Sequence, residues 1–400
     1  MGAGCGGNDV HPDDPPVNVL RRQRGVSLVE LMIALAIGTV LVLGLVQVFS
    51  ASRAAYQMSE GMSRVQENAR FAMDFLQRDV RMAGHFGCVN DQAHFVQDAG
   101  EPRDLTPAVA SLDFNVSIQG FEAADTAPGD TLEVGALTEW SAPPIALNPA
   151  PVAGSDILVL RYLSPLSSPV TEIGTVSATT LSVLLDHAAN LTHDGVSNPT
   201  IFGIADCSQA DVFAGTFGTH PDGTPTGVII ADQVVVDSLS ARYNPFPAGQ
   251  TRLYRANSIV YYVGISPTTG EPGLRRARAD GTGAYSVNEE LVEGVENVQF
   301  LYGRDETPII SSRTPPVGNI TSLDTAATIG ASAAEWRRVG LIQMGMLVRS
   351  PDRAVAPEAA SDAANPRVLG VEFEPADAND ARYRSTYEVT IALRNRLFGN

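Results

Sequence analysis

Hydrophobic and polar positions divide the chain into three parts. Residues 26–49 form an almost unbroken apolar run of about 24 residues, which is enough for a helix to cross a bilayer. In residues 50–82, apolar side chains recur every three or four positions, which predicts an amphipathic helix. From residue 156 onward, short runs rich in Val, Ile, Tyr and Thr predict β-strands. The pattern therefore predicts a long helix followed by a β-rich head.

The helical pattern predicts one continuous helix from Val26 to Met82. After Ser50 this segment contains no proline, and Gly61 is its only glycine. Such a helix would be about 85 Å long at 1.5 Å per residue, and Gly84 is the expected stop signal. Its second half carries one apolar stripe that should pack on the head. The stripe consists of Met58, Met62, Val65, Ala69, Ala72, Leu76 and Val80.

The head is predicted to be mainly antiparallel, because few helix-period segments separate its strands. Turn clusters at residues 267–273 and 279–283 support hairpins. Residues 98–155 suggest loops and short strands, and residues 305–335 and 351–381 are expected to be long surface loops. The predicted strands are 156–163, 179–185, 227–243, 257–265, 291–303, 338–350 and 382–396.

The start of the apolar run carries the most specific motif. Three arginines and Gly25 precede the run, and Glu30 is the one charged residue inside it. A carboxylate in hydrocarbon is costly and by default needs a partner. An uncleaved signal anchor would also place arginines before an apolar run, with that end in the cytoplasm. A secretory signal peptide would have a shorter apolar core. Neither alternative explains an acid five residues after a glycine.

This motif resembles the N-terminus of type IV pilins and pseudopilins. The resemblance implies that prepilin peptidase cuts after Gly25 and that the new N-terminus, Val26, is methylated. Val26 stands where phenylalanine is usual in that family. The resemblance also implies that Glu30 pairs with the N-terminal amine of a neighbouring subunit during assembly.

Segments further along the chain narrow the resemblance to the PilW group of minor pilins. They are residues 66–88, 155–165, 204–213, 290–303, 347–350 and 390–396. The region from Trp336 to Val339 is also similar to the J-type pseudopilin of type II secretion. That relative is typically shorter and lacks the segments AGHFGC and LRNR, which are present here at residues 83–88 and 393–396.

The PilW resemblance implies an α+β fold: a long pilin helix, transmembrane and then amphipathic, packed on a mainly antiparallel β head with long loops. Its expected parts are a leader (1–25), a transmembrane and assembly half of the helix (26–49), an amphipathic half (50–83) and a periplasmic head (84–400). The implied function is to join other minor pilins, initiate a type IV pilus and sit at or near its tip, supporting adhesion and twitching motility. The alternative is a J-type pseudopilin tip in type II secretion.

The implied partners are prepilin peptidase, other minor pilins, the major pilin and a tip adhesin. The implied location is the inner membrane, with a single pass and a periplasmic head, and then the pilus at the cell surface. The formal charge of −18 argues against a nucleic-acid partner, because phosphate binding needs clustered cations on the protein.

Three cysteines occur, and Cys5 would leave with the leader. Cys88 and Cys207 would then face the periplasm, where disulfides persist. We expect them to form a bridge that closes a loop of about 120 residues; the alternative is two buried free thiols.

The sequence contains no convincing catalytic or metal-binding motif, so neither an enzyme activity nor a cofactor is predicted. His85, Cys88 and His94 have a roughly ligand-like spacing, but a zinc site needs three or four ligands and Cys88 is better used in a disulfide. Asp222 and Asp280 begin short Asp-Gly-Thr turns without the oxygen-ligand series of a calcium loop. Glu30 is the one residue for which the pattern indicates a chemical role.

Overall fold

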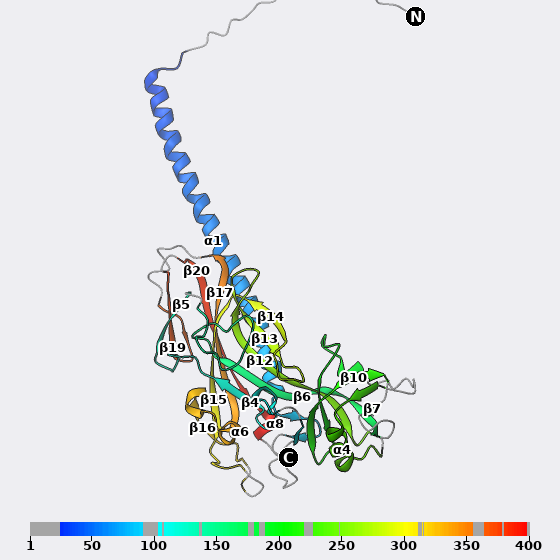
Figure 1. Ribbon diagram of the computed structural model, residues 1–400. Coiled ribbons are helices and arrows are strands. Elements are labelled where there is room, and N and C mark those ends of the chain that lie inside the picture. The colour runs from blue at the N-terminus through cyan, green and yellow to red at the C-terminus, as the bar shows by residue number, and fades with distance from the viewer. Residues whose placement is uncertain are drawn as a thin grey trace, which may run out of the picture. The chain divides into compact units, whose positions relative to one another are not determined.

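A computed structural model describes most of the chain. The described residues are 25–90, 103–105, 108–135, 138–174, 180–183, 189–219, 227–247, 249–310, 314, 316–354, 364–377 and 380–397. The chain divides into two compact units, Met1–Arg53 and Ala54–Asn400. Helix α1 (Leu28–Met82) runs through the boundary, and the second unit holds the sheets (Figure 1).

Helix α1 confirms the predicted long helix, with a small difference at its start. It begins at Leu28 rather than Val26, and the backbone N–H of Leu31 donates to the carbonyl oxygen of Ser27 over 3.1 Å. It ends at Met82, as expected. Gly84 follows with φ of 75°, a left-handed conformation that glycine adopts without steric cost.

The buried stripe on the second half of α1 is shorter than the sequence predicts. Met58 is 43% exposed, so the buried face begins at Gly61 rather than at Met58. A Cβ on Gly61 would lie 2.5 Å from the Cβ of Ala354, so the backbones meet closely there. The buried residues are Gly61, Val65, Ala69, Ala72, Leu76, Asp79 and Val80.

The largest sheet has eleven strands. Its main path runs in the order β10-β11-β7-β6-β12-β8-β9-β3; β13 pairs with β12 and β14, and β4 pairs with β6. Its strands are β3 (Arg103–Leu105), β4 (Ile118–Phe121), β6 (Ile157–Ile173), β7 (Thr180–Val183), β8 (Ile201–Ala205), β9 (Ala210–Ala214), β10 (Thr216–Thr219), β11 (Gly227–Ile230), β12 (Arg252–Ile265), β13 (Pro272–Arg278) and β14 (Val287–Glu293).

Three smaller sheets complete the head. A four-stranded sheet has the order β16 (Ile320–Asp324), β15 (Val295–Asp305), β17 (Val339–Arg353) and β20 (Arg382–Ala392). A three-stranded sheet joins β18 (Arg367–Val368), β19 (Val371–Pro375) and β5 (Thr131–Val134). Strands β1 (His85–Phe86) and β2 (Val89–Asn90) form a hairpin after α1. Among the strands in the described residues, the pairings are antiparallel except β3–β9 and β5–β19, which confirms the mainly antiparallel head.

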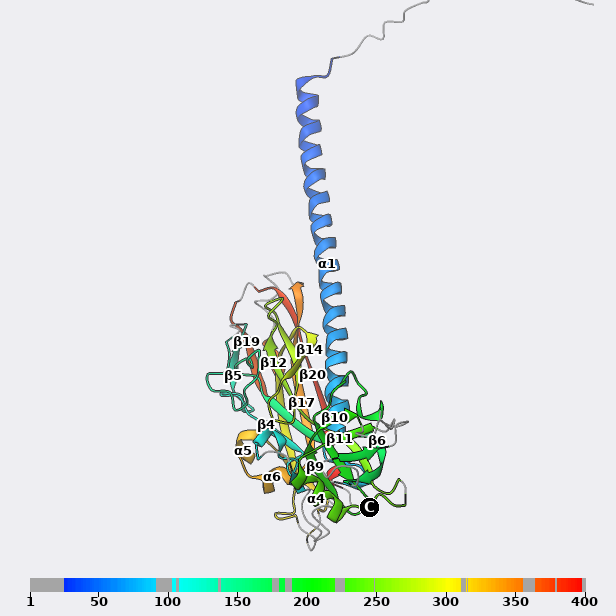
Figure 2. The ribbon, with the colours of Figure 1, turned by 45° about the vertical axis from the view of Figure 1, so that its right-hand side comes forward.

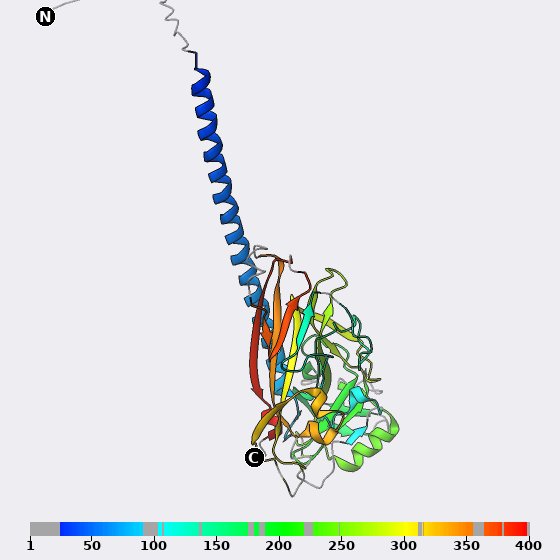
Figure 3. The same cartoon turned by 90° about the vertical axis from the view of Figure 1, so that its left-hand side faces the viewer.

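Short helices lie between the strands. They are the 3₁₀ helices η1 (Ala110–Leu112) and η2 (Ala189–Leu191), and the α-helices α4 (Gln233–Arg242), α5 (Ala326–Ile329), α6 (Ala333–Arg337) and α8 (Arg394–Leu397). Figures 2 and 3 show strands of the four-stranded sheet running beside the part of α1 that belongs to the second unit.

The main hydrophobic core joins the α1 stripe to both large sheets. Leu76 and Val80 belong to one buried cluster with Tyr261 of β12 and Val298 of β15. Asn68 donates through Nδ2 to the carbonyl oxygen of Glu293 over 2.9 Å. The Nδ2 of Asn395, in α8, donates to the carbonyl oxygen of Arg81 over 2.9 Å. The helix is therefore covered by strands from the C-terminal part of the chain.

One buried carboxylate lies inside the apolar stripe of α1. The Oδ2 of Asp79 accepts a hydrogen bond from the hydroxyl of Tyr261 over 2.5 Å and lies 3.1 Å from Nη1 of Arg276. Both partners come from adjacent strands, β12 and β13. Because a buried carboxylate needs such partners, these contacts fix the rotation and height of the helix against the large sheet.

Two further carboxyl groups, those of Asp156 and Glu122, link the end of β4 to β15 and α5. The two carboxylate oxygens of Asp156 accept from the backbone N–H groups of Ala123 and Phe300, over 2.9 and 3.0 Å. Glu122 accepts from the N–H of Ala326 over 2.9 Å, at the start of α5. Burial raises the pKa of Glu122 to about 7 and raises the pKa of Asp156 as well.

Two expectations from the sequence were wrong in part. Residues 233–242, expected to continue a strand, form helix α4, and only residues 227–230 are a strand. Residues 305–335 were expected to be a loop but contain β16, α5 and part of α6, and residues 351–381 contain β18 and β19. Residues 311–313, 315, 355–363 and 378–379 of these segments lie outside the described residues.

Candidate functional site

The residues of the predicted processing motif lie at and before the start of α1. Gly25 to Ser27 precede the helix, and Val26 is 68% exposed. An added Cβ on Gly25 would meet no atom within 4 Å. The peptide bond after Gly25 is therefore in a non-helical, accessible segment. Arg21, Arg22 and Arg24 lie outside the described residues.

Glu30 lies in the first turn of α1. An acidic group there interacts favourably with the partial positive charge of the free backbone N–H groups. The side chains around it are apolar and exposed on every side of the helix. Its most apolar 18-residue window has a mean hydropathy of 2.5, and none of that window is buried. By length and composition this helix can cross a membrane.

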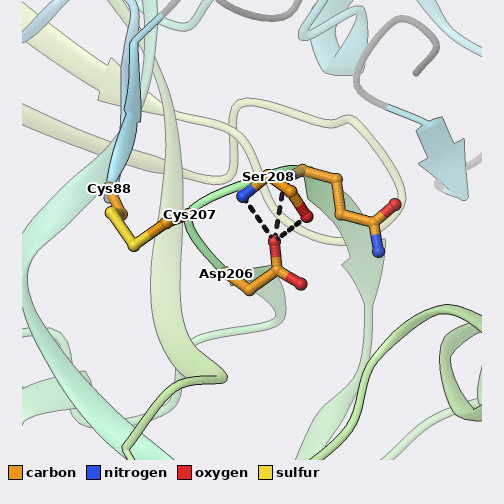
Figure 4. The surroundings of a disulfide bond; sticks show 5 residues. Cys88, Asp206, Cys207 and Ser208 are labelled. Carbon is orange, nitrogen blue, oxygen red and sulfur yellow. Dashed lines mark hydrogen bonds between the residues drawn. A yellow bond between two sulfur atoms is a disulfide. The ribbon is translucent and has the colours of Figure 1, made fainter.

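The structure joins Cys88 and Cys207 by a disulfide whose Cα atoms are 4.9 Å apart. Cys88 lies in the β1–β2 turn, which follows α1 directly, and Cys207 lies in the turn between β8 and β9. Asp206 orders the second turn, because its Oδ1 accepts from the N–H and the hydroxyl of Ser208 over 2.7 and 2.6 Å (Figure 4). The bridge therefore links the end of α1 to the turn between β8 and β9 of the large sheet.

The other sequence candidates do not come together as a site. Nδ1 of His85 lies 2.8 Å from the carbonyl oxygen of Leu163, and burial lowers the pKa of His85. His94 lies outside the described residues, as does Asp222. Oδ1 of Asp280 accepts the N–H of Thr282 over 2.9 Å, as in an ordinary turn. Within the described residues, no three His, Cys, Asp or Glu side chains are grouped so as to hold a metal ion.

Sequence reasoning missed Asp79, although a signal was present. Asp79 follows Leu76 by three positions and Ala72 by seven, so it falls on the apolar face of the helix. An acid at such a position predicts a buried partner. Its partners, Tyr261 and Arg276, could not be identified because they are distant in sequence.

Two segments of the chain match models of known protein families. Residues 20–46 match the model of the prokaryotic N-terminal methylation motif, and residues 260–395 match that of type IV pilus-assembly protein W. Together the two matches are consistent with a PilW-family pilin. The PilW match runs from β12 to α8, so it includes the strands that cover the buried stripe of α1. The chain matches no curated protein and no solved structure.

The two matches confirm the resemblance predicted from the sequence. They support a pilin-like role in pilus assembly, with processing by a peptidase and contact with the pilus machinery. The methylation motif and the apolar α1 together indicate membrane anchoring. The matched families are structural rather than catalytic in type.

Proposed function

We propose that this PilW-type pilin is a minor pilin that joins other minor pilins to initiate a type IV pilus and sits at or near its tip. The observation that carries the proposal is the pair of matches, the methylation motif at residues 20–46 and the PilW region at residues 260–395. The size of the second unit, Ala54–Asn400, also supports it, because a large head suits a cap better than a repeating shaft.

The proposal includes processing at the N-terminus. Prepilin peptidase removes residues 1–25 by cutting after Gly25, and the new N-terminal amine of Val26 is methylated. Residues 26–49 then serve as the membrane and assembly segment, residues 50–83 as the amphipathic half of the helix, and residues 84–400 as the periplasmic head. The chain starts in the inner membrane with a single pass and reaches the cell surface in the pilus.

Glu30 is proposed to align the subunits. A carboxylate at the centre of a membrane helix costs about 2.5–3.5 kcal/mol on insertion scales, and this is an upper bound for Glu30, which lies in the first turn. An amine at about 4 Å attracts it by about 4 kcal/mol at an effective dielectric constant of 20. The N-terminal amine of a neighbouring subunit therefore offsets the cost of Glu30 and fixes the stagger between two helices. The partners would be other minor pilins, the major pilin and a tip adhesin, supporting adhesion and twitching motility.

The alternative is a J-type pseudopilin at the tip of a type II secretion system, suggested by the region Trp336–Val339. The genes beside this one distinguish the two functions. Other minor pilin genes and a large adhesin gene support the pilus role, whereas a secretion operon supports the alternative.

Substitutions of Glu30 test the assembly role. Glu30→Ala keeps the helix, because alanine has the highest helix propensity, and Glu30→Gln keeps the shape but loses the charge. Both variants should be expressed and cleaved normally, fail to co-purify with other minor pilins, and leave few or no surface pili. Glu60→Gln, which changes an exposed carboxylate on the same helix paired with Arg64, is the matched control.

The position of processing is checked by mass spectrometry of the membrane-extracted protein. The N-terminus should be Val26, and Gly25→Val should block cleavage, because a branched side chain does not fit where the family has glycine. An intact Met1 or a cut after Phe49 would contradict the pilin role. Normal pili and normal partner capture by both Glu30 variants would remove the carboxylate from the mechanism.

A further inference from the structure

A small cavity in the second unit is lined by an unusual number of arginines. It has a volume of about 200 Å³ and lies between the last turns of α1, strands β6, β12 and β13, and the loop after η2. Four guanidinium groups line it, from Arg78, Arg255, Arg276 and Arg278. Such a cluster stands out in a chain whose formal charge is −18.

Arg276 is the well-paired member of this cluster. Its Nη1 lies 3.1 Å from Oδ2 of Asp79, and its Nη2 lies 2.7 Å from Oε1 of Glu289. Arg278 shares the same oxygen of Glu289, but its Nη2 lies 3.5 Å away. Charge-assisted N–H···O bonds are normally about 2.7–2.9 Å long, so Arg278 keeps most of its hydrogen-bonding capacity.

The other two arginines share one distant carboxylate. Oδ2 of Asp194 lies 3.7 Å from Nη2 of Arg78 and 3.8 Å from Nη2 of Arg255. The same oxygen is closer to Nε2 of His193, at 3.1 Å. Asp194 is held in a left-handed conformation, with φ of 57°. Its carboxylate therefore lies near Arg78, Arg255 and His193, and of these three contacts only the one with His193 is within normal hydrogen-bond length.

Arg255 is the most enclosed arginine of the cluster, and its Nε donates to Oδ1 of Asn257 over 3.2 Å. The residue is 4% exposed, and its Nη1 donates to the carbonyl oxygen of His193 over 2.5 Å. Burial and, next, repulsion by Arg278 lower the pKa of Arg255. Two carboxylates, of Asp79 and Asp194, line the cavity with the four guanidinium groups, and Glu289 pairs with Arg276 and Arg278 beside it. The four arginines therefore outnumber these three carboxylates by one.

We propose that this cavity binds a small oxyanion, a carboxylate or a phosphate, through Arg78, Arg255 and Arg278. Ligand pockets for drug-sized molecules enclose about 300–1,000 Å³, so this cavity suits only a small anion. Planar guanidinium groups bind carboxylate and phosphate oxygens through paired hydrogen bonds. The anion comes either from a Glu or Asp side chain of a partner polypeptide or from free phosphate. The inference goes beyond the proposed pilus role and does not depend on it.

Calorimetric titration of the full chain in a mild detergent tests the proposal. The probes are inorganic phosphate, N-acetylglutamate amide and, as a neutral match, N-acetylglutamine amide, all at constant ionic strength because salt screens charges. Saturable binding of phosphate or of the glutamate compound is expected, with none of the glutamine compound. Binding of the glutamate compound identifies a side-chain source, and binding of phosphate alone identifies a free anion.

Two arginine variants locate the binding. Arg78→Gln and Arg278→Gln should each weaken binding by roughly tenfold or more, the usual effect of losing a hydrogen bond to a charged group. Arg367→Gln, at an exposed ion pair with Glu372, should bind like the wild type. The side chain of Arg78 is 69% exposed, so Arg78→Gln decides the outcome even if Arg278→Gln fails to fold. No saturable anion binding, or undiminished binding by the folded variants, would overturn the proposal.

Discussion

The Cys88–Cys207 bridge should contribute strongly to the stability of the head. Its cysteines are separated by 119 positions. In the chain-entropy model, closing a loop of that size lowers the entropy of the unfolded chain by about 16 cal/mol/K, or about 5 kcal/mol at 25 °C. Both cysteines are exposed, so replacing them leaves no cavity. The loss should therefore reflect the cross-link itself.

The perturbation is the double variant Cys88→Ser/Cys207→Ser in the full chain. Native bridges in secreted domains contribute about 2–5 kcal/mol, and residual structure in the unfolded chain reduces the entropic value. We therefore expect the free energy of unfolding to fall by about 2–5 kcal/mol. Urea unfolding in mild detergent, followed by the fluorescence of the buried Trp336 and the partly buried Trp140, measures this change.

Two controls make the result decisive. Wild-type protein treated with reductant should unfold like the double variant, and the native far-UV circular dichroism of all samples should agree. A double variant as stable as the oxidised wild type, within about 0.5 kcal/mol, would refute the reasoning. Titration of the Cys88 and Cys207 thiols in purified wild-type protein would show that the bridge is absent in solution.

Two further predictions concern the head. Leu76→Ala should lower its free energy of unfolding by about 2–5 kcal/mol, because the loss of a fully buried side chain leaves a cavity between α1 and the sheets. Met58→Ala should lower it by under about 1 kcal/mol, because the Met58 side chain is partly exposed. Chemical denaturation of the two variants measures both changes. Glu122 has a folded pKa of about 7 against 4.5 for the ordinary group, so its contribution to stability is full below about pH 4.5 and is lost as the pH rises to about 7. Thermal unfolding across this range should show a smaller decline for Glu122→Gln, and equal slopes would contradict the assignment.

Local sequence patterns correctly predicted the helices and strands whose side chains are mostly apolar or alternate regularly between apolar and polar. The run after Val26 and the stripe through Leu76 are long and periodic, so α1 was predictable to within two residues at each end. Strand β12 is rich in β-branched and aromatic residues, which fit a pleated and buried surface.

The failures arose where tertiary packing decided between two local preferences. Residues 233–242 contain three consecutive valines, which favour a strand, yet Val235, Val236 and Leu239 are buried on one face of a helix. Asp232 stands at the N-cap position and was the signal for that helix. The partners of Asp79 and the arginine cavity were not predictable, because they bring together residues up to 200 positions apart.

The contacts that cover α1 also set an order for the maturation of the chain. The residues that hold the buried stripe in place, such as Tyr261 and Asn395, are made 182 and 314 positions after their partners on the helix. During synthesis, the stripe is therefore uncovered until most of the chain has followed, and exposed apolar surface of this kind aggregates readily. Both cysteines of the bridge emerge before Tyr261, so oxidation can precede docking of the helix. A folding factor that shields the stripe would act in the interval between those two events.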